Sequence, residues 1–80
     1  MSVALLWNSE HATMLVALRQ EKGLDAFQVA QLACLSQQQV HELEGRVSEA
    51  QRSAFYTPSI KAHAGHRLID MLRALPVAGP

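Results

Sequence analysis

The residues with the most informative chemistry form a short polar run, Gln37-Gln38-Gln39, followed by His41 and Glu42. A glutamine side chain carries a hydrogen-bond donor and an acceptor together, and this pair matches adenine N6 and N7 in the major groove of DNA. A glutamate can accept a hydrogen bond from cytosine N4, although phosphate repels its charge. The same residues could instead do no more than solubilise an exposed face, so their meaning depends on the elements that position them.

Two other groups of side chains are candidates for chemistry, but neither predicts a site. His63, His66 and Asp70 share one polar face of an expected helix, yet this set lacks a fourth ligand, so we expect no metal. Cys34 and His41 could be drawn as a nucleophile and its base, but a turn between helices offers no substrate pocket. We therefore expect Cys34 to be a small buried turn residue, and we predict no catalytic residue, no enzymatic activity and no small-molecule cofactor.

The composition of the 80-residue chain indicates a single small domain, residues 1–80, that is built from helices. Hydrophobic residues make up 49% of the chain and charged residues 18%, which suits a folded globular protein. Only four residues are aromatic, and Val, Ile and Thr are sparse beside Ala, Leu, Gln and Glu, so helix is favoured over sheet. All-α is therefore the expected fold class.

The cysteine content and the opening segment favour a cytoplasmic protein. The apolar opening segment, residues 1–7, lacks a basic start and meets polar residues at once, so it predicts neither a signal peptide nor a membrane span. The single cysteine cannot form an internal disulfide, which fits a reducing compartment.

The charges are distributed unevenly along the chain. Residues 1–45 carry five acidic against two basic side chains, and residues 46–80 carry five basic against two acidic ones. A polyanion would therefore be held mainly by the C-terminal half.

Capping residues and apolar spacing predict four helices. The expected ranges are Asn8 or Ser9 to Gly23, Ala26 to Ala33, Gln37 to Glu44, and Pro58 to Leu75. Between residues 46 and 56 the signal is weak, with at most a turn or two of helix around residues 48–54.

Three further positions bear on packing. Gly65 lies near the apolar side of the last helix, where glycine costs about 1 kcal/mol relative to alanine unless close packing uses the missing side chain. Trp7 belongs to the N-terminal arm, residues 1–7, and covers either the chain's own core or a second subunit. Phe55 and Tyr56 are expected to pin the last helix to the preceding helices.

Residues 24–45 resemble the helix-turn-helix of the phage Cro/repressor (Xre-like) family. The family pattern has an arginine late in the first helix, a Gly-Leu pair, an aliphatic-Ala pair, a small hydrophobic-Ser turn followed by Gln, and then aliphatic, Leu, Glu and Gly. The matching residues are Arg19, Gly23-Leu24, Val29-Ala30, Leu35-Ser36, Gln37, Val40, Leu43-Glu44 and Gly45. The resemblance covers about residues 12–45 and implies a small lambda-repressor-like domain of four to five helices.

The resemblance also implies roles for individual residues, because family members lay the second helix of the motif in the major groove. The candidate base-reading residues are Gln37, Gln38, His41 and Glu42. The candidate phosphate contacts are Ser36, Arg46, Arg52 and Lys61. Arg19 and Glu44 are expected to form an ion pair that joins the first helix to the end of the third.

The function that this resemblance implies is sequence-specific binding of duplex DNA by a small bacterial or phage transcriptional regulator, with a homodimer possible. The chain departs from the family pattern at Cys34, where glycine is usual, and at Glu42, where many members carry arginine. Its third helix has no Lys or Arg. The alternative is a protein-interaction module, since the same fold serves in the bacterial cell-shape scaffold whose cytoplasmic helix-turn-helix domain contacts a cytoskeletal filament.

Overall fold

The computed structural model describes residues 6–47 and 52–77. Within these ranges the chain forms helices and no strand, so the fold class is all-α as the composition predicts. The helices are α1 (Ser9–Glu21), α2 (Ala26–Ala33), α3 (Gln37–Leu43) and α4 (Pro58–Ala74). Of the stretch with a weak signal, residues 48–51 lie outside the described ranges, and residues 52–57 are not helical. No helix in the described ranges has the length and apolarity needed to cross a membrane.

The helix starts are fixed by side-chain caps at the expected positions. The Asp25 carboxylate accepts a hydrogen bond from the backbone N–H of Gln28, whose side chain in turn accepts from the Asp25 N–H. Ser36 and Gln39 form the same reciprocal box at α3. Each box satisfies N–H groups that a helix cannot pair within itself, which makes a short helix such as α3 stable enough to position side chains.

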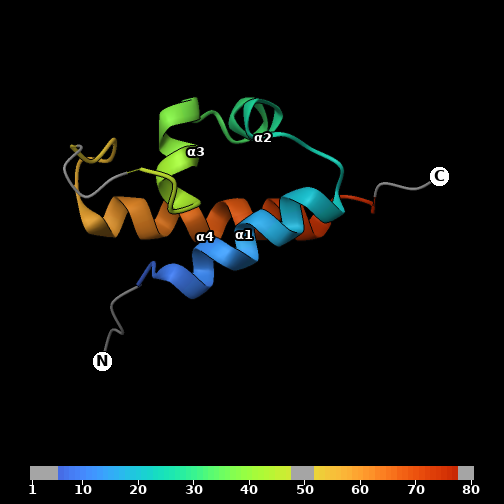
Figure 1. The fold of residues 1–80 in the computed structure, drawn as a ribbon, viewed down its shortest axis with the longest axis horizontal. Coiled ribbons are helices and arrows are strands. Elements are labelled where there is room, and N and C mark those ends of the chain that lie inside the picture. Colours follow the sequence, from blue (N-terminus) through green and yellow to red (C-terminus); the bar gives the residue numbers. More distant parts are fainter. Residues whose placement is uncertain (1–5, 48–51, 78–80) are drawn as a thin grey trace.

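The helices pair two by two, as Figure 1 shows: α1 lies against α4, and α2 packs on α3. The core is built from the inward faces of all four helices. The largest side chains that are fully buried in the described residues are Leu15, Val29, Val40, Leu43, Leu68 and Leu72. In α3 the buried residues are Val40, Leu43 and the acid Glu42, whereas its other polar residues are exposed or half-buried.

Cys34 lies in the short connection between α2 and α3 and adopts a left-handed conformation, with φ of 57°. Its side chain is exposed, so the expectation of a buried turn residue is wrong. The connection requires this conformation because it ends α2 and redirects the chain into α3, and the side chain is left pointing to solvent. Glycine adopts such a conformation without penalty, whereas other L-residues lose about 1–2 kcal/mol, which explains the glycine of the family pattern at this position.

Gly65 provides the space for the indole of Trp7. A Cβ atom at residue 65 would lie 2.5 Å from the ring carbons of Trp7. The indole Nε1 donates a hydrogen bond to the carbonyl of Leu43 at 2.8 Å, and the rings of His11 and His66 flank it. Trp7 therefore packs on the chain's own core, and the missing side chain of Gly65 is used for close packing.

Candidate functional site

The outward surface of α3 carries the uncharged polar residues that the sequence singles out. Ser36, Gln37 and Gln38 are exposed, and His41 is half-buried. They come from the N-cap and the first turns of α3, whose opposite side buries Val40 against the core. This surface offers amide, hydroxyl and imidazole hydrogen-bonding groups.

The third glutamine of the run has a different task from its two neighbours. The Gln39 side chain accepts a hydrogen bond from the backbone N–H of Ser36 at 2.9 Å. It also donates from Nε2 to the carbonyl of Ala54 at 3.2 Å. Gln39 therefore ties α3 to residues 52–57, and only Gln37 and Gln38 present their amides outward.

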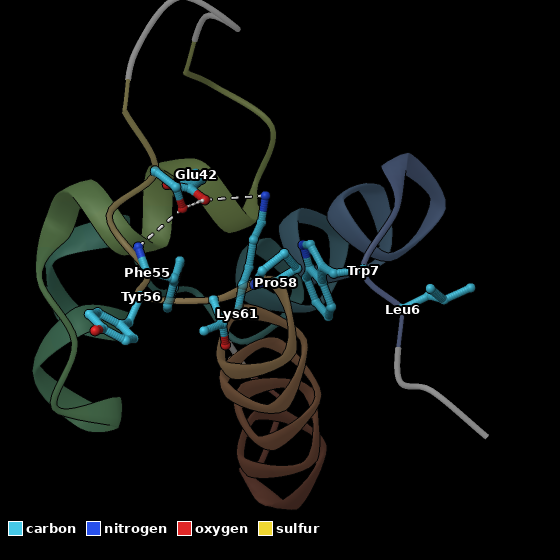
Figure 2. A pocket seen from close by; sticks show the side chains of 9 residues that line it. Leu6, Trp7, Glu42, Phe55, Tyr56, Pro58 and Lys61 are labelled. Atoms are coloured by element: carbon cyan, nitrogen blue, oxygen red, sulfur yellow. Dashed lines mark hydrogen bonds and ion pairs between the residues drawn. The ribbon is translucent and has the colours of Figure 1, made fainter. Parts of the chain in front are cut away.

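Glu42 does not belong to the outward surface, so the prediction that it reads bases is wrong. The residue is 6% exposed, and its carboxylate turns toward the segment that leads into α4. It accepts hydrogen bonds from the Ser53 hydroxyl at 2.7 Å and from the Ala54 N–H at 2.6 Å. The ammonium of Lys61 lies 3.3 Å from the same carboxylate (Figure 2). The acid is thus fully engaged inside the molecule.

These contacts keep Glu42 ionised. Burial alone would raise its pKa, but the hydrogen bonds from Ser53 and Ala54 and the positive charge of Lys61 outweigh burial. The pKa of Glu42 consequently lies below its ordinary value. The negative charge is therefore present near neutral pH, but it is neutralised locally.

Lys61 is a phosphate candidate that the structure places elsewhere. Its ammonium binds Glu42, and its side chain is only 28% exposed. The pair of Lys61 with Glu42 has no net charge, whereas Arg46 shares the Glu44 carboxylate with Arg19, so Lys61 is a weaker phosphate candidate than Arg46. The lysine joins α4 to α3 instead.

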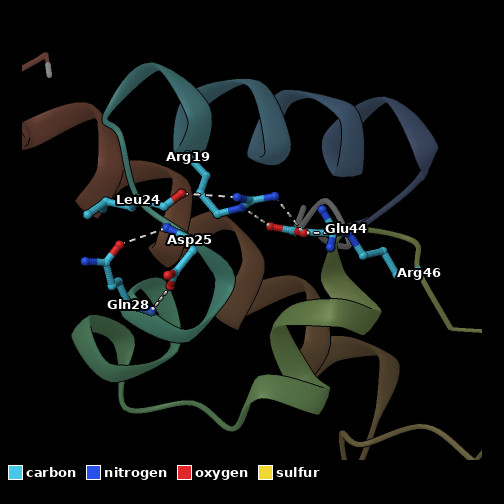
Figure 3. Close-up of polar contacts among 6 residues, drawn as sticks. All are labelled: Arg19, Leu24, Asp25, Gln28, Glu44 and Arg46. Carbon is cyan, nitrogen blue, oxygen red and sulfur yellow. Dashed lines mark hydrogen bonds and ion pairs between the residues drawn. The ribbon is translucent and has the colours of Figure 1, made fainter.

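The ion pair between Arg19 and Glu44 is present in the expected place, at the contact between α1 and the end of α3. Arg19 donates from Nε to Glu44 Oε2 at 2.6 Å and from Nη2 to Oε1 at 3.3 Å (Figure 3). The Glu44 side chain is completely buried and that of Arg19 is 9% exposed. Arg19 also donates from Nη1 to the carbonyl of Leu24, so the arginine holds the start of the α2 segment as well.

The three other phosphate candidates remain at the surface. Arg46 follows α3 directly, and its side chain is 50% exposed although its Nε lies 3.1 Å from Glu44 Oε1. Arg52 is exposed in the segment that precedes α4. Ser36 is exposed, and its hydroxyl oxygen accepts from the Gln39 N–H, which leaves its own proton for another acceptor.

Sequence reasoning missed a hollow beside Glu42, with a volume of about 410 Å³, which Glu42 and Lys61 help to line. Its walls come from the N-terminal arm, the segment before α4 and the first turn of α4 (Figure 2). The residues that line it include Leu6, Trp7, Phe55, Tyr56 and Pro58. Phe55 is buried as expected, but Tyr56 is 93% exposed and does not pin α4.

No three His, Cys, Asp or Glu side chains within residues 6–47 and 52–77 are grouped so that they could hold a metal ion. Comparisons of the chain with protein-family models, with curated proteins and with solved structures found no match.

Proposed function

We propose that the chain binds duplex DNA sequence-specifically, as a small prokaryotic transcriptional regulator of the lambda-repressor-like, Xre-like kind. In this proposal α2 and α3 form the helix-turn-helix, and the outward surface of α3 enters the major groove. The observation that best supports the proposal is that the neutral and the charged polar residues of α3 lie on different sides of the helix. Gln37 and Gln38 face outward, while the charge of Glu42 is turned inward and paired.

The burial of Glu42 removes the strongest objection to a groove-facing α3. A carboxylate on that surface would be repelled by the phosphates that line the groove. With Glu42 paired to Lys61, the outward surface of α3 consists of neutral hydrogen-bonding groups. Each exposed glutamine can pair with an adenine through its donor and acceptor.

Backbone contacts in this proposal come from the two ends of α3 and from the basic half of the chain. Ser36 is exposed at the start of α3, and Arg46 and Arg52 are exposed after its end. Phosphate contacts hold the protein in register, whereas base contacts choose the sequence. His41 is half-buried and is the weaker base-reading candidate of the three that remain.

The proposal is tested by titrating the protein with mixed-sequence duplex at two salt concentrations, followed by selection of preferred duplexes from a random pool. We expect salt-dependent binding and, for Gln37→Ala, a relaxed preference at one base position worth about 1–3 kcal/mol. Nonspecific affinity of this variant should stay unchanged. Absence of salt-sensitive duplex binding by the native chain would overturn the proposal.

A homodimer on DNA extends this proposal. Helix-turn-helix dimers place two recognition helices about 34 Å apart, so that they meet successive turns of the major groove. Selected duplexes should then contain two related half-sites at that spacing. Light scattering of the complex gives the number of chains per duplex, and a mass of one chain per selected site would contradict the dimer.

A second candidate function is protein binding, and the hollow beside Glu42 favours it. Leu6 and Tyr56 line this hollow and are 67% and 93% exposed, which leaves large apolar side chains beside an open recess. For an interaction module, co-sedimentation with a cytoskeletal filament should be lost in Tyr56→Ala and kept in Gln37→Ala. For a DNA-binding protein, the two variants should show the opposite pattern with duplex.

A further inference from the structure

The carboxylate of Glu44 is shared by two arginines that lie in different surroundings. Arg19 uses both Nε and Nη2 on Glu44 and Nη1 on the Leu24 carbonyl, and its side chain is 9% exposed. Arg46 approaches the same carboxylate from the other side (Figure 3). It contacts Glu44 Oε1 through Nε at 3.1 Å while half of its side chain is exposed.

A guanidinium that is bound through Nε keeps its outer edge, formed by Nη1 and Nη2, for another partner. This edge presents two parallel N–H groups that match two oxygens of a phosphate. We propose that Glu44 is a positioning residue that holds Arg46 by Nε so that its Nη1/Nη2 edge grips a phosphate of the DNA backbone. This inference rests on the proposed DNA-binding function and assigns a second task to a residue of the buried ion pair.

The charges of the three residues support this assignment. Two guanidinium groups and one carboxylate leave one net positive charge, and the exposed member of the group is Arg46. Glu44 is completely buried and lies against Arg19, so its negative charge is already compensated when Arg46 binds an anion. Holding a long side chain in place before binding also reduces the entropy that it loses on binding.

Conservative variants of Arg46 separate positioning from charge. Arg46→Lys keeps the positive charge but has no Nε–H at the point of contact with Glu44 and no planar two-pronged edge. We expect this variant to keep the salt dependence of duplex binding. Its Kd should rise by about two- to tenfold, because a side chain that is not held in place before binding must lose its conformational freedom on binding. Arg67→Lys is the matched control, because Arg67 is an exposed arginine of α4 that is not among the proposed phosphate contacts, and the Kd of this variant should stay at the native value.

A double-mutant cycle tests the role of Glu44 itself. Glu44→Gln leaves one acceptor oxygen for two arginines, so it should raise the Kd of the native chain. It should have no further effect in the Arg46→Ala background. In that background the slope of log K against log salt concentration should already be smaller by about one, because one phosphate contact is missing. Binding is measured at a temperature at which circular dichroism shows each variant folded. If Glu44→Gln proves unfolded, the comparison of Arg46→Lys with Arg67→Lys still decides the question.

The inference is overturned if Arg46→Lys binds duplex as tightly as the native chain. It is also overturned if Glu44→Gln raises the Kd by the same factor in the presence and absence of Arg46. Both results would leave the proposed DNA binding intact. A native chain that fails to bind duplex removes the proposed function and this inference together.

Discussion

Glu42 and Glu44 lie two residues apart at the end of α3 and are buried to the same degree, with 6% and 7% exposure, yet their surroundings differ. Glu44 contacts two arginines, one of them buried with it. Glu42 is held by a hydroxyl, a backbone N–H and one partly exposed ammonium. The partners of Glu42 can reach water when the acid is removed, whereas Arg19 cannot. Equal burial therefore does not imply an equal contribution to stability.

The largest effect is expected for Glu44→Ala. This variant leaves the Arg19 guanidinium buried without a counter-charge, which costs about 3–5 kcal/mol for a desolvated pair. The free energy of unfolding from denaturant titration measures the loss. Arg46→Ala is the matched control, because its half-exposed side chain should contribute less than about 1 kcal/mol. Equal losses in the two variants would contradict the distinction between the buried and the exposed arginine.

A smaller loss is expected for Glu42→Gln. The amide cannot accept from Ser53, Ala54 and Lys61 together, and weakening hydrogen bonds to a charged group costs about 1–3 kcal/mol. The exposed Glu21→Gln should stay within about 0.5 kcal/mol of the native chain. A loss in Glu42→Gln as large as that in Glu44→Ala would remove the contrast between the two acids.

Acidification should reveal the contribution of Glu42 without a change in packing. The pKa of Glu42 is lower in the folded chain than its ordinary value of 4.5, which applies to the unfolded chain. The ionised acid therefore stabilises the fold above that ordinary value, and this contribution is lost as pH falls through the lower folded pKa. The difference in unfolding free energy between the native chain and Glu42→Gln should shrink from about pH 7 to about pH 3. A constant difference would show that ionisation of Glu42 contributes nothing.

The smallest effect is expected for Lys61→Met. The ammonium is the partly exposed partner of Glu42, and such an ion pair is worth less than about 1 kcal/mol. Because Lys61 is engaged with Glu42, its replacement should also leave the salt slope of duplex binding unchanged. A slope reduced by about one would show that Lys61 contacts phosphate after all.

How well the sequence predicts each of these contacts depends on where the partners lie. The pairing of Arg19 with Glu44 is predicted by the resemblance of residues 12–45 to a helix-turn-helix pattern, which has an arginine and a glutamate at these two positions. The partners of Glu42 come from residues 53 and 54, where neither periodicity nor caps predict a structure. Helical spacing alone therefore could not show whether Glu42 faces the groove or this segment. At Gly65 the sequence leaves open whether the missing side chain costs stability or allows close packing, and the contact with Trp7 becomes visible only in three dimensions.

The position of Trp7 has a consequence for spectroscopy. The chain has one tryptophan and one cysteine. The indole bonds to the Leu43 carbonyl at the last turn of α3, and the exposed Cys34 thiol precedes the first turn. The seven residues of α3 extend about 10 Å at the helical rise of 1.5 Å per residue. A fluorophore coupled to Cys34 can therefore accept excitation energy from Trp7 through space. The native sequence thus already contains a donor and a labelling site at the two ends of α3.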